Sequence, residues 1–476
     1  MKIHDTSRTK IIATIGPATE SEEKIRELIL SGIDICRLNF SHGSFAEHER
    51  SIRNIRKINK ELGTHVAILA DLQGPKIRLG IMEKEGIIIS DGDEVTIINR
   101  EERGSRNKLF ISYSHLPKDV KKGDSILIDD GRIKLEVVST DRKSEIITKV
   151  VHGGPLYSKK GVNLPDTLIS ASGLTEKDRN DLKFILENDL DWLALSFVRS
   201  ANDIIELRRI ILEHGKEILV LAKIEKPEAL NEIDHIIEIS DAIMIARGDL
   251  GVEVSFDRVP YIQKQIVQKC VHKSTPVVVA TQMLESMITN FRPTRAEAND
   301  VANAVFDCAD AVMLSGETSV GQYPIESIKS MQKIIDYAEG TVFVHKHEHS
   351  PEIDSESYIP DSVCFNACRM ADQSGAKAII AFAAKPHTAF RLAGHRPKSP
   401  ICIFTYDAKI LNQLSIVWGV WAFLIDKNRN VDDSLKFAIN LLKEKKLIQN
   451  GDRVVQVSSL PLYDFGGVNT IKLSTV

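Results

Sequence analysis

A lysine and two carboxylates stand where two buried stretches of the chain end. The apolar run 218–222 leads into Lys223 and Glu225, which lie two residues apart and therefore point to the same side of a strand. A second apolar run, 242–246, is followed by Asp249. Carboxylates are ligands that Mg²⁺ prefers, and an ammonium can neutralise a phosphate. These residues alone fit a metal and phosphate site and a structural ion-pair network equally well.

Eight apolar runs, separated by segments with helical periodicity, make up the part of the chain that contains these residues. They are 10–15, 33–38, 66–70, 192–197, 218–222, 242–246, 276–281 and 311–316. Eight strand–helix units predict a TIM barrel, in which the active site lies at the C-terminal ends of the strands. Nine polar residues fall at those ends: Arg37, Asn39, Asp71, Ser196, Lys223, Glu225, Asp249, Thr281 and Glu317. Their shared position favours a catalytic site over a structural ion-pair network.

The strand–helix alternation is interrupted after the third run. Residues 75–171 form short segments that are rich in β-branched residues and separated by turn signals. This pattern predicts a small all-β domain inserted into a barrel that consists of residues 1–74 and 172–342. Thr175, with Asp178 three residues later, predicts the N-cap of the helix with which the barrel resumes.

Residues 343–476 predict a third domain with an open α/β fold. A polar stretch at 345–357, rich in acids and histidines, fits a solvated connector better than a metal site. Beyond it, apolar runs alternate with helical patterns and lack a GxGxxG or Walker A motif. The runs are 377–382, 401–405, 420–425 and 453–457.

Composition narrows the class of protein. The 476 residues are too many for one core, which predicts two to four domains. The net charge of −4 argues against a general polyanion-binding surface. The first five residues contain no apolar signal core, and no apolar run approaches membrane-spanning length. None of the six cysteines forms a C-x-x-C pair, which predicts buried free thiols in a reducing cytosol. Cys364 and Cys368 are at helical spacing, and core packing is favoured over metal binding there.

Several long motifs resemble the pyruvate kinase family. They are the segments 36–43 (CRLNFSHG), 159–165 (KKGVNLP), 246–253 (ARGDLGVE), 280–297 and 313–318 (MLSGET). The resemblance extends over essentially the whole chain. It implies a barrel domain, an inserted β domain that acts as a lid, and a C-terminal regulatory domain.

The resemblance implies a phosphotransferase that catalyses the last step of glycolysis. The phosphoryl group of phosphoenolpyruvate would move to ADP, and the enolate would then be protonated to pyruvate. Such a transfer needs alignment and charge neutralisation more than covalent help. Glu225 and Asp249 would hold Mg²⁺ or Mn²⁺, and Lys223 would stabilise charge on the moving phosphoryl group.

Further residues match the family's substrate-binding positions. Arg37 matches the arginine that binds the substrate phosphate. The backbone amides of Gly248 and Asp249 would hold the substrate carboxylate, aided by the helical turn that follows. Thr281 also matches a substrate-binding position, and its hydroxyl is expected to feed the path that delivers the proton.

The nucleotide is expected to contact four other residues: Asn39, His42, Arg78 and Lys160. Arg78 and Lys160 belong to the inserted domain, so that closure of this lid would complete the site. His42 fits a local structural cap almost as well as a nucleotide contact.

Two positions depart from the usual family pattern for binding K⁺. Leu72 stands where a threonine is usual, and Lys76 stands where a glutamate is usual. Asn39, Ser41 and Asp71 remain as part of the monovalent-cation site. The ammonium of Lys76 is expected to substitute for the cation, which predicts an enzyme that does not require K⁺. The alternative is that Lys76 is a solvated lysine and K⁺ still binds weakly.

The C-terminal domain also departs from the family. Sugar-bisphosphate-regulated members carry a Ser/Thr/Gly-rich phosphate loop, whereas residues 383–388 here read AAKPHT. Proline removes an amide donor from this loop, which argues against regulation by fructose bisphosphate. Lys385 and His387 could bind another phosphorylated small molecule. We also expect a cytoplasmic homotetramer without a nucleic-acid or membrane partner.

Two other functions fit part of the sequence. Another Mg²⁺-dependent barrel enzyme acting on phosphoenolpyruvate or a small 2-oxo acid, such as a lyase, would not need Arg78 and Lys160 on a lid. A scaffold protein with a dead site would be expected to have lost Lys223, Glu225 or Asp249, and all three are present.

Overall fold

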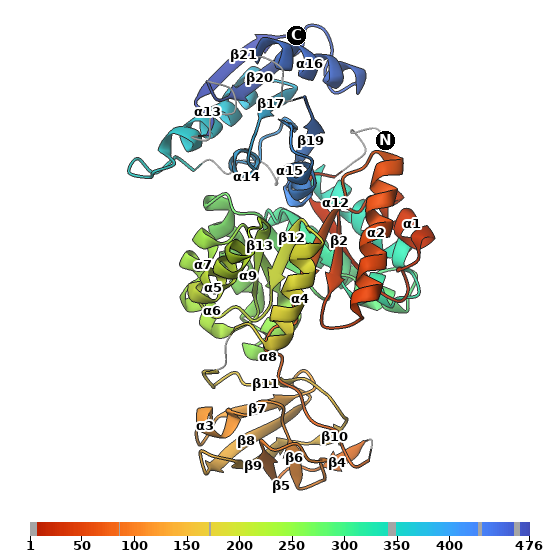
Figure 1. The fold of residues 1–476 in the computed structure, drawn as a ribbon, viewed down its shortest axis with the longest axis vertical. Coiled ribbons are helices and arrows are strands. Elements are labelled where there is room, and N and C mark those ends of the chain that lie inside the picture. Colours follow the sequence, from red (N-terminus) through yellow and green to blue (C-terminus); the bar gives the residue numbers. More distant parts are fainter. Residues whose placement is uncertain (1–6, 85, 171–172, 341–348, 427–430, 461–466) are drawn as a thin grey trace.

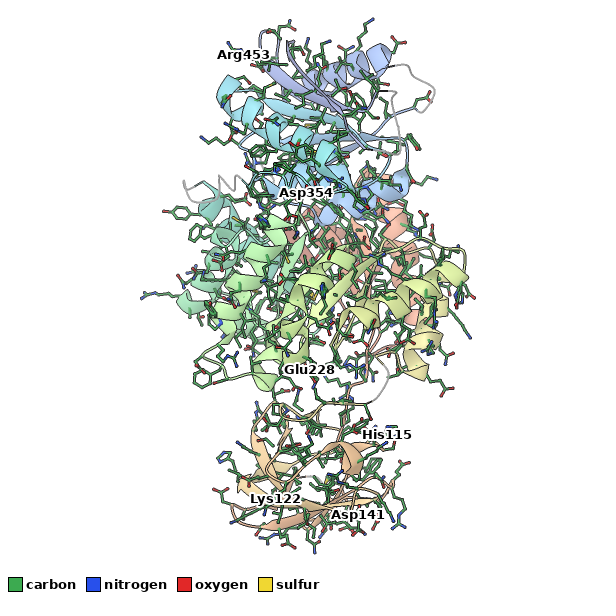
Figure 2. The ribbon with its side chains drawn as sticks, turned by 90° about the vertical axis from the view of Figure 1, so that its left-hand side faces the viewer. His115, Lys122, Asp141, Glu228, Asp354 and Arg453 are labelled. Carbon is green, nitrogen blue, oxygen red and sulfur yellow. The ribbon has the colours of Figure 1, made fainter. Side chains whose placement is uncertain are left out.

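The computed structural model describes residues 7–84, 86–170, 173–340, 349–426, 431–460 and 467–476. Figure 1 shows three units stacked along the long axis, with a barrel in the middle, a β domain at one end and the C-terminal α/β domain at the other. In Figure 2, Lys122 and Asp141 mark the β domain, and Glu228 lies at the end of the barrel that faces it. None of the helices within the described ranges is both long and apolar enough to span a bilayer.

The barrel is closed and consists of eight parallel strands, as the sequence predicts. Around the barrel the strand order is β1-β16-β15-β14-β13-β12-β3-β2. The strands are β1 (Lys10–Ile15), β2 (Ile35–Asn39), β3 (Ala67–Asp71), β12 (Trp192–Leu195), β13 (Leu219–Ile224), β14 (Ala242–Ala246), β15 (Val277–Ala280) and β16 (Ala311–Leu314). Apart from one residue each in β2 and β13, every residue in these strands is buried, because helices cover the outside and side chains fill the interior.

Helices surround the barrel, and several of them begin with a capping box. Ser44, Thr175 and Thr294 each accept a hydrogen bond from the backbone N–H three residues later. The helices are α1 (Glu22–Leu30), α2 (Phe45–Leu62), α4 (Glu176–Glu187), α5 (Ala201–Glu213), α6 (Pro227–Asn231), α7 (Ile233–Ile239), α8 (Arg247–Glu253), α9 (Val259–His272), η2 (Glu285–Ile288), α10 (Arg295–Phe306), α11 (Gly316–Ser319) and α12 (Pro324–Glu339). The cap predicted at Thr175 is therefore confirmed.

Three barrel strands end earlier than the apolar runs suggest: β16 ends at Leu314 within the run 311–316, and two others end at positions that matter for the site. The run 192–197 stops being a strand at Leu195, and the run 276–281 stops at Ala280. Phe197 and Thr281 have φ angles of 55° and 69°, which lie in the left-handed region and end a strand. Hydrophobicity records burial, whereas the strand ends where the backbone turns, so the runs overestimate the strand lengths.

The inserted unit, which we call the lid, is all-β apart from one short helix. Its strands β4 (Ile87–Ile89) and β10 (Gly154–Leu156) form one small sheet. A second sheet has the order β11-β7-β8-β9-β5-β6. Its strands are β5 (Glu94–Ile98), β6 (Lys108–Phe110), β7 (Ser125–Ile128), β8 (Ile133–Thr140), β9 (Glu145–His152) and β11 (Val162–Asn163), with α3 (Leu116–Asp119) beside them. The lid has its own apolar core.

The C-terminal domain is an open sheet flanked by helices, with the strand order β19-β18-β17-β20-β21. Its strands are β17 (Ala378–Phe382), β18 (Ile401–Thr405), β19 (Val420–Leu424), β20 (Arg453–Ser458) and β21 (Thr470–Thr475). Its helices are α13 (Tyr358–Ser374), α14 (His387–Gly394), α15 (Ala408–Gln413), η4 (Leu414–Ile416) and α16 (Val431–Glu444). The edge strand β21, antiparallel to β20, was not predicted, because its largely exposed residues carry no long apolar run. Of the predicted linker at 345–357, residues 345–348 lie outside the described residues.

The C-terminal domain is joined to the N-terminal ends of the barrel strands through buried polar contacts. Arg396 is 2 % exposed, and its guanidinium donates to the Cys308 carbonyl oxygen at 2.6 Å and to the Asp310 carboxylate at 2.9 Å. Asp310 also accepts the backbone N–H of Trp418 at 3.2 Å. The indole N–H of Trp192 donates to the Gln413 carbonyl oxygen at 3.1 Å. These contacts join the two domains.

We expect Arg396→Met to destabilise the protein by about 3–5 kcal/mol, because it leaves the Asp310 carboxylate buried without its cation. The measurement is the midpoint of denaturant unfolding followed by circular dichroism. Arg209→Met is the matched control, since Arg209 pairs with Glu213 on the exposed face of α5 and such pairs contribute about 0.5 kcal/mol or less. Equal midpoints for the two variants would contradict the prediction.

Candidate active site

The ammonium of Lys223 lies at the centre of the C-terminal end of the barrel. It donates to the Ser196 hydroxyl at 2.6 Å and lies 3.0 Å from a carboxylate oxygen of Glu225 and 3.2 Å from one of Asp71. The second carboxylate oxygen of Glu225 accepts the backbone N–H of Phe197 at 2.7 Å. All these side chains are buried, so the three acceptors fix the position of the ammonium.

Arg37 extends this cluster toward the first strand. Its Nε donates to Asp71 at 2.7 Å, and its Nη1 donates to the hydroxyl of Thr14 at 2.9 Å. Strand pairing places Asn39 opposite Asp71, which brings the ends of β2 and β3 together. Asp71 is therefore shared between two cations, Arg37 and Lys223.

The shared burial of these charges and their proximity shift their pKa values. Burial disfavours ionisation of Asp71, but Lys223 and Arg37 outweigh it and hold the pKa of Asp71 below its usual value. Burial also lowers the pKa of Lys223, but Asp71 and Glu225 reverse this effect and raise it. Burial raises the pKa of Glu225, Lys223 opposes the shift, and the nearby Asp249 adds to it. The site thus retains a charged lysine, and its cations stabilise the ionised form of Asp71 more than that of Glu225.

Asp249 enters the site from α8, the short helix that directly follows β14. Its carboxylate is about one-third exposed, and the Lys76 ammonium lies 3.7 Å away. The preceding amide, that of Gly248, donates to the Thr281 hydroxyl at 2.7 Å, and this hydroxyl donates to the Ala280 carbonyl oxygen at 2.6 Å. An acidic ligand at the start of α8 would compete with Thr281 for the Gly248 amide.

Arg247 fixes the start of α8 and was not singled out in the sequence. Its guanidinium donates to the Thr281 carbonyl oxygen at 2.8 Å and to the Asp300 carboxylate at 2.7 Å. Ser196 and Thr14 also have larger roles than predicted, because each bridges two other polar groups. In the sequence, the role of Arg247 is indicated only by its position between the apolar run 242–246 and Gly248.

The predicted nucleotide residues lie in two separate places. Asn39 belongs to the barrel mouth, and its side-chain oxygen accepts the backbone N–H of Ser41 at 3.1 Å. The side chain of Arg78 donates to the Lys159 carbonyl oxygen at 3.2 Å, and Lys160 pairs with Asp129 at 2.9 Å, so that both are held within the lid. Burial, followed by the nearby Arg78, lowers the pKa of His42.

The residues that could hold a divalent cation are Glu225 and Asp249. Across the described parts of the chain, no group of three or more His, Cys, Asp or Glu side chains is arranged to hold a metal ion. Two carboxylates suit Mg²⁺, which takes one or two of them and completes its shell with substrate phosphates and water. Burial is the main cause of the raised pKa of Glu225, and the proximity of the second carboxylate, Asp249, adds to it.

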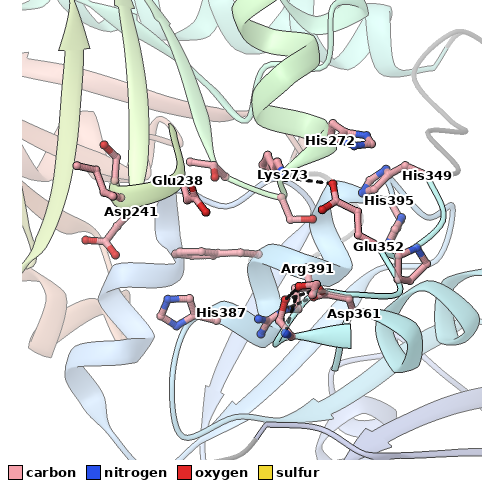
Figure 3. A pocket seen from close by; sticks show the side chains of 18 of the residues that line it. Glu238, Asp241, His272, Lys273, His349, Glu352, Asp361, His387, Arg391 and His395 are labelled. Carbon is pink, nitrogen blue, oxygen red and sulfur yellow. Dashed lines mark hydrogen bonds and ion pairs between the residues drawn. The ribbon is translucent and has the colours of Figure 1, made fainter. Parts of the chain in front are cut away.

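A larger cavity, of about 550 Å³, lies at the other end of the barrel, against the C-terminal domain (Figure 3). Its walls carry an ion pair between Lys273 and Glu352 at 3.2 Å and another between Arg391 and Asp361. It lies beside the N-terminal ends of the strands, where TIM barrels carry stability rather than catalysis. We therefore place the chemistry at the charged mouth at the opposite end of the barrel.

The comparisons with known proteins agree with the geometry. The family model "Pyruvate kinase, barrel domain" matches residues 6–328, and "Pyruvate kinase, alpha/beta domain" matches residues 361–474. A pyruvate kinase from Geobacillus stearothermophilus is 41 % identical over 98 % of this chain and 80 % of its own length. One from Corynebacterium efficiens is 42 % identical over 98 % of this chain and 97 % of its own. The crystal structure of a pyruvate kinase from Cryptosporidium parvum superposes with a TM-score of 0.92, covers 100 % of this chain and 97 % of its own, and is 33 % identical.

Proposed function

Because the chain belongs to the pyruvate kinase family, we propose that it transfers the phosphoryl group of phosphoenolpyruvate to ADP and releases pyruvate. The observation that carries this proposal is the Lys223 ammonium, held between Asp71 and Glu225 and next to Arg37. Two fixed cations beside two carboxylates suit a reaction in which negative charge must be aligned and neutralised. Enzymes of glycolysis work in the cytoplasm, where the six buried thiols would stay reduced.

We assign a separate role in the reaction to each residue of the barrel mouth. Arg37 binds the phosphate of phosphoenolpyruvate, and the amides of Gly248 and Asp249 hold its carboxylate. Lys223 stabilises charge on the phosphoryl group during transfer. Mg²⁺ or Mn²⁺ bound by Glu225 and Asp249 would supply further charge neutralisation when present.

Proton delivery and nucleotide binding complete the proposal. The hydroxyl of Thr281, already hydrogen-bonded at the start of α8, leads a proton toward the enolate. Asn39 and His42 contact the nucleotide from the barrel, and Arg78 and Lys160 contact it from the lid. Closure of the lid would therefore bring the two halves of the nucleotide site together. We further propose a homotetramer, as the family resemblance implies.

The proposed activity is tested by incubating the protein with phosphoenolpyruvate and Mg²⁺, with and without ADP. We expect pyruvate to form only when ADP is present, because Arg78 and Lys160 serve a nucleotide. Pyruvate formed at an equal rate without ADP would instead indicate a lyase or phosphatase.

Variants of the metal ligands serve as controls in the same assay. Glu225→Gln and Asp249→Asn should each lose most of the turnover while circular dichroism shows a folded protein, because Mg²⁺ loses a charged ligand. Near-normal turnover of either variant at millimolar Mg²⁺ would contradict the metal assignment.

We also propose that the enzyme needs no K⁺. The side chain of Leu72 is apolar and buried, so it offers no oxygen to the remnant site formed by Asn39, Ser41 and Asp71. The ammonium of Lys76 points toward the barrel mouth, where it lies 3.7 Å from Asp249. A fixed ammonium and K⁺ about 4 Å apart, at an effective dielectric constant near 20, would repel each other by about 4 kcal/mol.

The K⁺ proposal predicts a flat rate when KCl replaces tetramethylammonium chloride at constant ionic strength. Strong activation by KCl would show that K⁺ binds despite Lys76. The double substitution Lys76→Glu with Leu72→Thr is the matched control, since it removes the ammonium and adds an oxygen ligand. It should create K⁺ dependence, and an active double variant that ignores K⁺ would contradict the ammonium argument.

A phosphorylated effector other than fructose 1,6-bisphosphate is proposed for the C-terminal domain. Residues 383–385, His387 and Thr388 line a cavity of about 320 Å³ at the start of α14. Pro386 has no amide hydrogen to offer a phosphate. Lys385, His387 and Arg391 supply the positive or polar groups that a smaller phosphate ester would need.

Fructose 1,6-bisphosphate is therefore expected to leave the phosphoenolpyruvate saturation curve unchanged. The measurement is the half-saturating phosphoenolpyruvate concentration at zero and at micromolar bisphosphate. A clear shift to lower concentrations would show that the loop at 383–388 does bind the bisphosphate.

A further inference from the structure

The buried carboxylate of Glu253 connects the lid to the barrel. Glu253 is the last residue of α8, and its side chain is 1 % exposed. Its Oε1 accepts from the side-chain amide of Asn163, in lid strand β11, at 2.8 Å. The same oxygen pairs with the ammonium of Lys226, at the start of α6 in the barrel, at 2.6 Å. One carboxylate oxygen thus joins the two domains at the point where the chain passes between them.

The other oxygen of this carboxylate has no hydrogen-bond partner among the described residues. Glu253 borders a cavity of about 20 Å³, which is large enough for one water molecule. Lys76 and Asp249 border the same small cavity. A buried carboxylate oxygen without a hydrogen bond costs free energy. Its presence here therefore calls for an explanation.

An ion pair also connects the lid to α8. The Lys76 ammonium, in the chain segment that enters the lid, lies 3.7 Å from Asp249. In Figure 1, α8 is the barrel helix next to β11 of the lid. Since α8 also carries Asp249 and the Gly248 amide, any change in how the lid rests on α8 is transmitted to the barrel mouth.

We propose that Glu253 is a positioning residue that couples the lid to α8, with Asn163 as its lid contact and Lys226 as its anchor in the barrel. The proposal rests on the proposed function, because it assigns these residues to the closure that brings Arg78 and Lys160 to the nucleotide. The contact is buried on both sides, so it serves as the pivot about which the lid turns. Residues at such pivots influence turnover and substrate affinity together.

The test compares steady-state kinetics of Asn163→Ala, Glu253→Gln and Asn163→Asp with those of the wild type. Asn163→Ala removes only the lid contact and leaves the Lys226–Glu253 ion pair in place. We expect kcat/KM for ADP to fall about tenfold or more in each variant, since each loses a buried hydrogen bond to a charged group. Asn163→Asp should show the largest loss, because it places two carboxylates together.

The double substitution Asn163→Asp with Glu253→Gln provides the specific readout. It exchanges the amide and the carboxylate, so that the net charge is kept and the carboxylate that can pair with Lys226 moves from α8 to the lid side of the contact. Recovery of kcat/KM to within about threefold of the wild type would demonstrate direct coupling between the two residues. Losses in the single variants without recovery in the double variant would overturn the proposal, as would single variants with wild-type kinetics.

Asn99→Asp is the matched control within the lid. The side-chain amide of Asn99 donates to the carbonyl oxygens of Ser114 and Lys143, both lid residues. Because neither acceptor belongs to the barrel, the substitution Asn99→Asp should leave the kinetic constants unchanged. A loss equal to that of Asn163→Asp would show that any disturbance of the lid has the same effect, and would overturn the proposal.

Hydrogen–deuterium exchange of the amides in α8 gives a readout that does not depend on activity. The Val254 amide donates to the Leu250 carbonyl oxygen at 2.9 Å, and we expect it to exchange faster in Asn163→Ala than in the wild type. Unchanged exchange would overturn the coupling even if the wild type is an active pyruvate kinase. Faster exchange in a protein without pyruvate kinase activity would instead refute the proposed function and leave the coupling intact.

Discussion

Charge balance around one buried ammonium is the constraint on which the barrel mouth depends. Lys223 is desolvated, and a lysine in that state stays charged only if carboxylates lie close to it. Asp71 and Glu225 meet this need from two different strands, and Ser196 accepts the remaining hydrogen bond. The strands β3, β12 and β13 must therefore end at the same level, which a closed parallel barrel provides.

The same balance leaves the mouth ready for a cationic ligand. Asp71 is neutralised by both Arg37 and Lys223. Glu225 shares the Lys223 ammonium with Asp71 and is also repelled by the Asp249 carboxylate. A divalent cation would add counter-charge to Glu225 and Asp249, where the lid supplies the ammonium of Lys76, 3.7 Å from Asp249. The arrangement thus explains chemically why a site for phosphoryl transfer would hold both fixed cations and free carboxylates.

The short helix α8 connects the chemistry to the rest of the molecule. Its first turn carries Gly248 and Asp249, and Arg247 holds it to β15 and α10. Its last residue, Glu253, contacts the lid. The opposite end of the barrel is occupied by the C-terminal domain, where Arg396 and Asp310 form a buried pair. The N-terminal end of the barrel is therefore bound to the C-terminal domain through a buried ion pair, and its C-terminal end faces the lid.

The sequence by itself determined the number and order of the barrel strands, the insertion of a β domain and the open C-terminal sheet, because burial on both faces of a strand leaves a local record in the residue types. It also placed Lys223, Glu225 and Asp249 at strand ends, since periodicity assigns side chains to a face. It missed β21 and overestimated three barrel strands, because neither an exposed edge nor a turn of the backbone changes hydrophobicity. Only the tertiary structure decided which polar groups meet: Ser196 with Lys223, Lys76 with Asp249 and Asn163 with Glu253. Those pairings depend on strand register and on how the lid rests on the barrel, and both are set by contacts between residues far apart in the chain.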